Sequence, residues 1–300
     1  MKIRLAINGF GRIGRLVLRA LCESKRKDIK IVAINDLGSP EANAHLFKYD
    51  TVHGQFPGKI IVKNNSFDVG LGAIKVFSEK DPADLPWKKL NVDVVLECTG
   101  LFSNREMSQK HLTAGAKKVL ISAPADEVDC TVVFGVNHKQ LTKKHSIVSN
   151  ASCTTNCLAP IASVLHKEIG INSGYMTTIH SFTGDQRIVD TLHKDLYRAR
   201  AASNSMIPTS TGAAQAVGLV LPELKGKLDG TAIRVPTANV SLIDFTFIVR
   251  RNTSAKEINN AIKKAAKNEF KNIIDINSCL LYTSDAADDT PCVDLGGRRI

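Results

Sequence analysis

INGFGRIGR, residues 7–15, is the most informative stretch of this chain about its architecture. It sets Gly9, Gly11 and Gly14 at the spacing G-x-G-x-x-G, directly after an apolar run at residues 3–7 that indicates a strand. A helix to about residue 22 and a second apolar run at residues 29–36 are expected to follow. Asp36 ends that second run. Glycines between a strand and a helix, together with an acidic residue at the end of the next strand, predict a dinucleotide-binding turn.

The residues of this turn have separate physical roles. Gly9 permits the tight turn, Gly11 lets the backbone approach a pyrophosphate, and Gly14 lets the helix pack on the strand. The helix N-terminus offers N–H groups and the positive end of its dipole to the phosphates. The Asp36 carboxylate suits an adenosine ribose and would repel a 2′-phosphate, so we expect NAD rather than NADP. Without this context, the three glycines would indicate only a turn.

The same alternation continues through the first half of the chain. Near-continuous apolar runs are separated by helical segments, one of them near residues 103–114. Such runs predict parallel strands that are buried on both faces. We therefore expect an α/β fold, with a Rossmann-type doubly wound parallel sheet in a cofactor domain over residues 1–150. The further runs lie at residues 92–100, 117–124, 130–136 and 145–150.

From residue 151 the pattern changes to longer strands with helices on one side. This change predicts an α+β catalytic domain over residues 151–278, with a mixed or antiparallel sheet. Residues 184–208 are rich in Arg and weakly periodic, and fit neither a strand nor a helix. Helices are expected at residues 153–168, 211–224 and 254–270, the last capped by Ser254, and strands at residues 174–183 and 241–250.

Composition narrows the classes of protein that the chain can represent. The net charge is +11, but Lys and Arg are scattered and aromatic residues make up only 5%. This favours a basic surface that attracts anionic substrates over a nucleic-acid platform. No apolar run approaches the roughly 18 residues of a membrane span, and the N-terminus has no signal-peptide pattern. We expect a cytoplasmic protein whose seven cysteines are free thiols.

The stretch SNASCTTNC, residues 149–157, contains a candidate reactive cysteine. Cys153 begins a predicted helix, where the dipole and free N–H groups stabilise a thiolate. No second Cys/His pair follows at zinc-ligand spacing, so we expect no metal site. Cys157, one turn further along, is expected to be buried and inert. His180 is a candidate base for Cys153, although either residue alone would more commonly be structural.

A cysteine, a histidine and a dinucleotide together suit the oxidation of an aldehyde. Attack by the thiolate gives a hemithioacetal, the histidine takes a proton, and a hydride leaves to the nicotinamide. The thioester that remains can be cleaved by water or by phosphate. The residues alone leave that choice open.

Six stretches, in order and spacing, resemble the phosphorylating glyceraldehyde-3-phosphate dehydrogenases over about residues 1–275. The resemblance implies oxidation of D-glyceraldehyde 3-phosphate to 1,3-bisphosphoglycerate with NAD and inorganic phosphate, in glycolysis and gluconeogenesis. It also implies a homotetramer, in which residues 184–208 line the cofactor sites of neighbouring subunits. The stretches are INGFGRIGR, SNASCTTNCLAP, HSFTGDQR, HKDLYRAR, PTSTGAA and LDGTAIRVPT.

The resemblance also assigns roles to individual residues. Cys153 would be the nucleophile, and His180 its base and later its acid. Arg forks and hydroxyl groups suit the two phosphate sites that the reaction needs. The inorganic phosphate would bind Ser152, Thr154, Thr211 and Gly212, the substrate's C3 phosphate would bind Thr183, Arg198 and Arg234, and NAD would bind Gly9, Gly11, Arg12, Ile13, Gly14, Asp36, Lys80 and Ser122.

After about residue 276 the sequence departs from the family pattern. Residues 279–300 do not provide the family's further strand, its Trp-Tyr-Asp-Asn segment or its final helix, and we interpret them as a tail of doubtful origin, similar to translated adapter sequence. A chain without those elements is expected to be poorly active or prone to aggregate. Two alternative functions stay open: an erythrose-4-phosphate dehydrogenase, and a basic nucleotide- or RNA-binding protein without catalysis.

Overall fold

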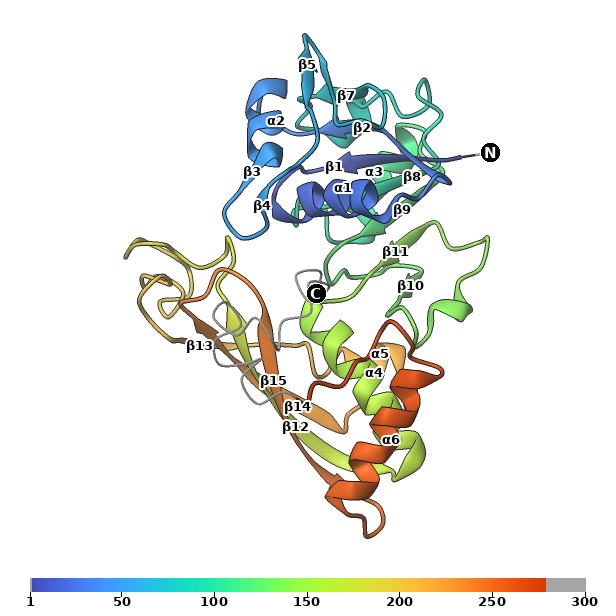
Figure 1. The fold of residues 1–300 in the computed structure, drawn as a ribbon, viewed down its shortest axis with the longest axis vertical. Coiled ribbons are helices and arrows are strands. Elements are labelled where there is room, and N and C mark those ends of the chain that lie inside the picture. The colour runs from blue at the N-terminus through green and yellow to red at the C-terminus, as the bar shows by residue number, and fades with distance from the viewer. Residues whose placement is uncertain (1, 279–300) are drawn as a thin grey trace.

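The described residues form three sheets, of which the two large ones organise the chain and lie in the upper and lower halves of Figure 1. The structure is a computed structural model and describes residues 2–278. The proposed tail at residues 279–300 lies outside the described residues. A short link between residues 149 and 153 joins the last strand of the first sheet along the chain to the first helix of the second half.

The first sheet has nine strands in the order β10-β11-β9-β8-β1-β2-β7-β6-β5. Strands β10, β11, β9, β8, β1, β2 and β7 pair in parallel, and β5 and β6 form an antiparallel edge. The prediction of a doubly wound parallel sheet is confirmed. The strands are β1 (Ile3–Asn8), β2 (Ile29–Asn35), β5 (Ile61–Lys63), β6 (Ser66–Asp68), β7 (Ile74–Phe77), β8 (Val94–Glu97), β9 (Lys118–Ile121), β10 (Cys130–Thr131) and β11 (Ile147–Ser149).

Helices cover this sheet because its strands are apolar on both faces. Ala6, Ile7, Val95 and Ile147 are all fully buried. The chain order reverses at β1, which lies between β2 and β8. In such sheets ligands bind at the carboxyl ends of the strands beside this reversal. The remaining elements of this half are α1 (Arg12–Ser24), α2 (Pro40–Lys48), α3 (Arg105–Thr113), β3 (Tyr49–Asp50) and β4 (Gly54–Gln55).

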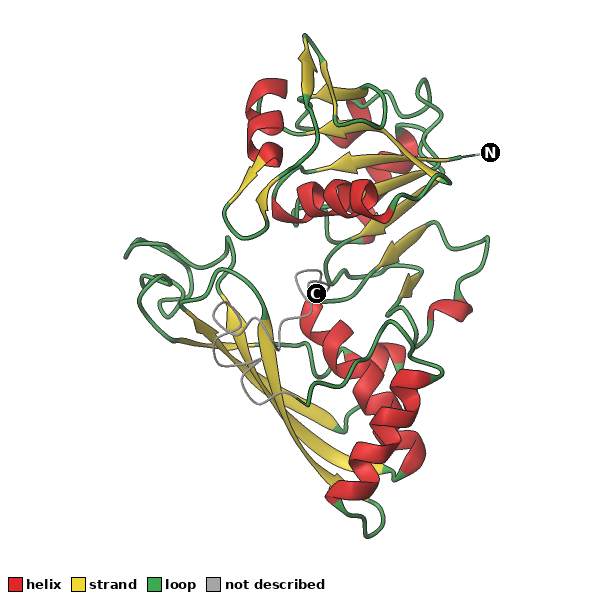
Figure 2. Cartoon of the chain, viewed as in Figure 1, coloured by secondary structure: helices red, strands yellow, loops and turns green. Residues whose placement is uncertain are grey.

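The second sheet has four strands in the order β13-β14-β12-β15. β12 runs parallel to β14 and antiparallel to β15, so the sheet is mixed, as predicted. Its helices lie on one face only (Figure 2). The elements are α4 (Cys153–Glu168), β12 (Ile171–Ser181), β13 (Ile207–Ser210), α5 (Val217–Val220), β14 (Leu228–Val235), β15 (Ser241–Val249) and α6 (Ala255–Lys267), with Ser254 as N-cap of α6.

Alternation along β15 shows how this half is packed. Residues 243, 245, 247 and 249 face inward and pack against the core, which includes Leu158 and Met176. Residues 242, 244, 246 and 248 are exposed on the outer face. The helices therefore bury one face of the sheet and leave the other open to solvent.

Two predicted elements are wrong. The strand expected at residues 130–136 covers only Cys130–Thr131, because the Asn137 side chain bonds the Val133 N–H and the Thr131 carbonyl and diverts the chain from the sheet. The helix expected at residues 211–224 is reduced to Val217–Val220. Gly212 and Gly218 are poor helix formers, and Pro222 lies just beyond the shortened helix.

Candidate active site

Cys153 is the first residue of α4, immediately after the link from β11. Ala151 has φ 58°, a left-handed conformation that turns the chain sharply into the helix. The Ser152 hydroxyl caps the helix by accepting from the Thr155 N–H at 2.9 Å. Cys153 thus sits at the positive end of a 16-residue helix and is exposed.

His180, near the carboxyl end of β12, meets Cys153 across 27 residues of sequence. Its Nε2 lies 3.1 Å from the Cys153 Sγ. The hydrogen bond from His180 outweighs the opposing effect of burial, and the pKa of Cys153 falls from its ordinary 9.0 to about 7. The charge of His180 and a bond from the Thr154 backbone assist. A substantial fraction of Cys153 is therefore thiolate at neutral pH.

The second ring nitrogen of His180 has two neighbours. Nδ1 lies 2.8 Å from the Ser181 carbonyl oxygen and 2.7 Å from Nη1 of Arg234. Because Nδ1 carries either a proton or a lone pair, these contacts belong to different protonation states. Protonated Nδ1 donates to Ser181, and bare Nδ1 accepts from Arg234. Both partners hold the ring in one orientation toward Cys153.

Arg234 reaches His180 because the two residues are directly opposite in the β12–β14 register. Its Nε is buried and has no hydrogen-bond partner among the described residues. Burial and the nearby charge of Arg198 both lower the pKa of Arg234. A buried, unpaired guanidinium donor is costly, and an anion such as a phosphate would satisfy it.

Arg198 is held in place by the 184–208 loop and β13. Its Nε and Nη2 donate to the Thr209 hydroxyl at 2.9 and 2.7 Å, and its Nη1 donates to Asp185 at 2.7 Å. The structure therefore brings Arg198 and Arg234 into one electrostatic group. Sequence reasoning missed Asp185 and Thr209, although both lie within quoted stretches, HSFTGDQR and PTSTGAA.

The remaining predicted phosphate residues surround the start of α4 or the 184–208 loop. The Thr211 hydroxyl accepts from the Ala213 N–H, and the Ala213 carbonyl accepts from Thr155 Oγ1 at 3.0 Å, which fastens this turn to α4. A side chain built at Gly212 would meet open space. Thr154 is buried. Thr183 differs, because its N–H and hydroxyl bond to the buried Gln186.

A cavity of about 440 Å³ lies at the carboxyl ends of β1, β2 and β8. Of the predicted cofactor residues, Gly9, Gly11, Asp36 and Lys80 line it. Asp36 also accepts from the backbone N–H groups of Phe10 and Gly38 at 2.8 and 3.0 Å, and so fixes the fingerprint turn. The sequence reasoning missed the other lining residues, namely Asn8, Asn35, Leu37, Glu79, Cys98, Thr99, Leu101 and Phe102.

The other predicted cofactor residues lie around the cavity rather than on its lining. Arg12 pairs with Asp50 at 2.8 Å, and Ile13 is exposed on the first turn of α1. Ser122 donates its backbone N–H to the Glu97 carbonyl and contacts Cys98. Gly14 packs against the fingerprint turn itself.

The three fingerprint glycines have the geometry that their predicted roles require. Gly9 has φ +87°, which side chains rarely tolerate. A Cβ on Gly14 would lie 2.2 Å from the Gly9 carbonyl oxygen, so helix and strand can approach only with glycine there. A Cβ on Gly11 would meet nothing within 4 Å, which leaves its backbone open to the cavity. The turn thus fits a dinucleotide pyrophosphate.

The predicted burial of Cys157 is wrong, because this thiol is exposed. Residues four apart share one face of a helix, so Cys157 emerges on the same side as Cys153. The predicted direction of its pKa is nevertheless correct. Partial desolvation and the charge of Cys153 raise the pKa of Cys157.

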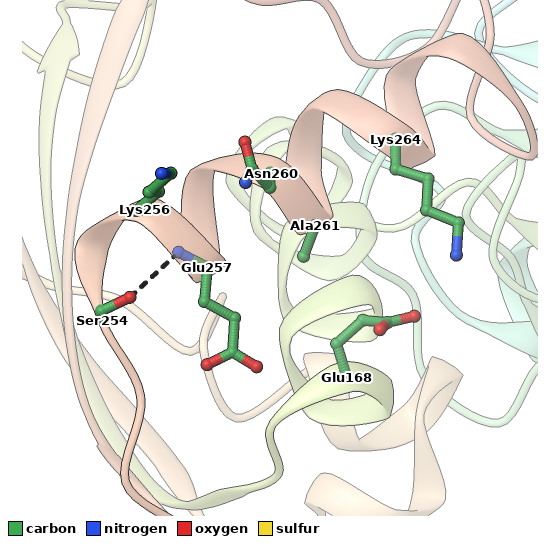
Figure 3. A pocket seen from close by; sticks show the side chains of 7 residues that line it. All are labelled: Glu168, Ser254, Lys256, Glu257, Asn260, Ala261 and Lys264. Carbon is green, nitrogen blue, oxygen red and sulfur yellow. Dashed lines mark hydrogen bonds between the residues drawn. The ribbon is translucent and has the colours of Figure 1, made fainter.

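A second hollow, of about 400 Å³, lies between the last turn of α4 and α6 (Figure 3). Its lining mixes Lys256 and Lys264 with Glu168 and Glu257, and Glu257 is already bonded to Arg251. Glu168 lies about 22 Å along α4 from Cys153 at 1.5 Å per residue. This hollow is therefore separate from the reactive thiol.

Residues 2–278 contain no cluster of side chains suited to a metal ion and no helix long and apolar enough to cross a bilayer.

Comparison with known families agrees with this geometry. The model of the glyceraldehyde 3-phosphate dehydrogenase NAD-binding domain matches residues 3–105, and the model of the C-terminal domain matches residues 152–295. The second match enters the segment 279–300, beyond the point near residue 276 where the resemblance was expected to end.

Individual relatives agree with the family models. The chain is 64% identical to a glyceraldehyde-3-phosphate dehydrogenase of Xanthobacter flavus and 61% identical to one of Cereibacter sphaeroides, each over 91% of this chain and 82% of the relative. A chromosomal enzyme of the same name from Cupriavidus necator is 56% identical over 95% of this chain and 85% of the relative. Because both domain models match and the relatives are 56–64% identical over most of their length, the chain belongs to the glyceraldehyde-3-phosphate dehydrogenase family.

Proposed function

We propose that Cys153 and His180 carry out the oxidation of D-glyceraldehyde 3-phosphate to 1,3-bisphosphoglycerate, with NAD and inorganic phosphate. The observation that carries the proposal is the 3.1 Å contact between the Cys153 Sγ and His180 Nε2, together with a Cys153 pKa of about 7. Cys153 follows β11, which is parallel to the strands that end at the cavity. The thiol and the cavity therefore arise from the same edge of one sheet.

In the first step the Cys153 thiolate attacks the aldehyde carbon, and the resulting oxyanion takes the proton held on His180 Nε2 to give a hemithioacetal. His180 Nε2 then accepts the hydroxyl proton as the C–H bond releases its hydride, which leaves a thioester on Cys153. When bound, NAD supplies the hydride acceptor. Inorganic phosphate attacks the thioester carbon and expels the Cys153 thiolate, which regenerates the enzyme. The attacking phosphate gives up its own proton to solvent, so the Cys153 thiolate and the proton on His180 Nε2 are both restored for the next cycle.

The charged residues beside this pair support binding of two phosphate groups. Arg234 has a buried donor that no described residue accepts, and Arg198 lies close enough to lower the pKa of Arg234. We assign the C3 phosphate to Arg198, Arg234 and Thr183. The attacking phosphate is assigned to the turn around Thr211 and the first turn of α4, namely Ser152, Thr154, Thr211 and Gly212.

The fingerprint turn supports the predicted NAD contacts of Gly9, Gly11 and Asp36. We also propose that Arg12, Ile13, Gly14, Lys80 and Ser122 complete the cofactor site at its rim. Residues 1–150 would then form the cofactor domain and residues 151–278 the catalytic domain. The boundary between the two would fall in the link that ends at Cys153.

We further propose a cytoplasmic homotetramer. Free thiols such as Cys22 and Cys98 suit a reducing compartment. The outer face of the second sheet exposes Tyr175, Leu242 and Ile248, and the 184–208 loop exposes further large apolar side chains. Large apolar side chains exposed on one face of a sheet support contact with another copy of the chain. Light scattering coupled to size exclusion would measure the assembly, and a monomeric mass would contradict it.

The reaction is tested by following NADH formation with and without inorganic phosphate. The proposal predicts faster turnover of glyceraldehyde 3-phosphate than of erythrose 4-phosphate, and a rate that depends on phosphate. The Cys153→Ser variant should form no NADH. A preference for erythrose 4-phosphate, with thioester cleavage by water, would contradict the proposed substrate. Thiol-independent, salt-sensitive RNA binding without NADH formation would favour the non-catalytic alternative.

A further inference from the structure

Three neighbouring strands end in buried polar residues at the base of the 440 Å³ cavity. Asn8 of β1 lies between Asn35 of β2 and Glu97 of β8, and each pair is in direct register. Asn8 and Glu97 are each 1% exposed. None of the three takes part in the proposed chemistry. Polar groups this deeply buried are retained only with complete hydrogen bonding, so their partners reveal their role.

Asn35, Asn8 and Glu97 form a row across the three strands. The hydrogen bonds along this row run in one fixed direction. At one end, the Asn35 side chain accepts from the Glu79 N–H at 2.8 Å and donates to the Glu79 carbonyl at 2.9 Å. Asn35 Nδ2 also donates to Asn8 Oδ1 at 2.7 Å, and Asn8 Nδ2 then donates to Glu97 Oε2 at 2.6 Å. If either side-chain amide were flipped, a donor would face a donor or an acceptor would face an acceptor. The Glu79 backbone therefore sets the orientation of both amides.

A second chain of bonds reaches Glu97 from the other side. The Trp87 indole can only donate, and its Nε1 lies 3.0 Å from His111 Nδ1. Nδ1 is therefore the acceptor, and the neutral ring carries its proton on Nε2. That N–H donates to Glu97 Oε2 at 2.9 Å. Trp87 and His111 are both fully buried.

Glu97 is thus the point where donors converge. Oε2 accepts from Asn8 and His111, while Oε1 accepts from the Thr99 N–H at 2.8 Å and from the Thr99 hydroxyl. Only a group that accepts at both oxygens satisfies all four donors, and an ionised carboxylate is that group. In a glutamine at position 97, the side-chain NH2 would replace one of these oxygens and would face donors that need an acceptor.

This row holds both walls of the cavity. Through Asn35 it fixes Glu79, next to Lys80 on one wall, and through Glu97 it fixes Thr99 on the other. Thr99 in turn abuts the fingerprint turn, because a Cβ on Gly9 would lie 2.7 Å from the Thr99 nitrogen. The spacing between Thr99 and Gly9 therefore depends on Glu97.

We propose that Glu97 is a positioning residue for dinucleotide binding, acting through Thr99 on one wall and through Asn8 and Asn35 on the other. The proposal rests on the assignment of this cavity to NAD. It predicts that a change at Glu97 weakens NAD binding without touching the Cys153–His180 pair.

The test compares Glu97→Gln with Asp93→Asn in the full chain. Asp93 immediately precedes β8, bonds Arg4 and Lys117, and lies about 13 Å from Glu97 along the strand. Both variants change a carboxylate to its isosteric amide, but only one lies in the row. NAD affinity is measured by titration calorimetry, and the emission of Trp87, the only tryptophan, reports on its bond to His111.

Glu97→Gln is expected to weaken NAD binding about tenfold or more and to change Trp87 emission, because a buried donor is left unpaired. Asp93→Asn should match the wild-type chain in both measurements. Asn35→Ala, which removes the tie to Glu79 without altering a charge, should also weaken NAD binding and keeps the test valid if Glu97→Gln does not fold. Wild-type affinity in both Glu97→Gln and Asn35→Ala, or an equal loss in Asp93→Asn, would overturn the proposal. A wild-type chain that does not bind NAD would instead overturn the assignment of the cavity.

Discussion

Replacing His180 with Asn gives the sharpest prediction for the reactive thiol. His180 supplies the largest effect that lowers the pKa of Cys153 to about 7, and burial alone would raise it. Without the imidazole, we expect the pKa of Cys153 to return to 9.0 or above. At pH 7 the thiolate fraction would then fall from about one half to about one hundredth, a change of about fiftyfold for two pKa units.

The rate of alkylation should fall less than the thiolate fraction. A thiolate of higher pKa is intrinsically more nucleophilic, with a Brønsted slope of about 0.4–0.5. A rise of two pKa units therefore makes each thiolate about eightfold more reactive. Together with the roughly fiftyfold smaller thiolate fraction, this gives an alkylation rate at pH 7 that is about sixfold lower than in the wild-type chain. The same reasoning predicts that the variant becomes the faster of the two above about pH 8.

The assay is alkylation by iodoacetamide from pH 5.5 to 10.5, with peptide mapping of Cys153. The other described thiols should react slowly at pH 7, because burial raises the pKa of Cys22 and Cys98 to about 11. His45→Asn is a matched control, since His45 lies on α2 and is exposed. A midpoint that stays near pH 7 in His180→Asn, or profiles that do not cross, would refute the role given to His180.

Three further predictions concern the cofactor half. Gly14→Ala should lower the free energy of unfolding by about 3 kcal/mol, while Gly11→Ala should change it little and weaken NAD binding. Urea unfolding would measure the stability of both variants, and titration would measure their NAD affinity. An equal loss of stability in the two variants would contradict the close packing assigned to Gly14. Burial opposes the shift of Asp129, but bonds from the N–H groups of Ile147 and Ser146 and from Arg105 hold the pKa of Asp129 at about 2. Its stabilisation is therefore present above the unfolded pKa and lost as the pH falls toward 2, so Asp129→Asn should cost about 1–2 kcal/mol at pH 7 and almost nothing at pH 2 in thermal unfolding. Asp36→Asn should reduce the preference for NAD over NADP about tenfold in paired titrations, because the repelling charge is removed; an unchanged ratio would show that Asp36 does not select the cofactor.

The features predicted correctly from sequence depend on neighbours in the chain. The fingerprint turn follows from three glycines within six residues, and the start of α4 follows from the small polar residues before Cys153. Both can be recognised because local conformation and function use the same residues. The prediction for Cys157 failed on a point that helix periodicity could have corrected, since residue 157 shares a face with residue 153.

The features that could not be predicted depend on contacts between distant segments. The row at the cavity base joins Asn8, Asn35 and Glu97 with His111 and Trp87, from five separate parts of the chain. One signal was available, because each of the first three residues ends an apolar strand at the edge where ligands bind. Their hydrogen-bond directions emerge only when the strands are in register.

Detection of the thioester would show whether Cys153 is the nucleophile. The chain is mixed with NAD and glyceraldehyde 3-phosphate without inorganic phosphate, and intact-mass analysis with peptide mapping locates any acyl group. We predict one acyl group per chain on Cys153, formed together with an equal amount of NADH and released when phosphate is added. An acyl group on another cysteine, or NADH formed without acylation of Cys153, would exclude Cys153 as the nucleophile.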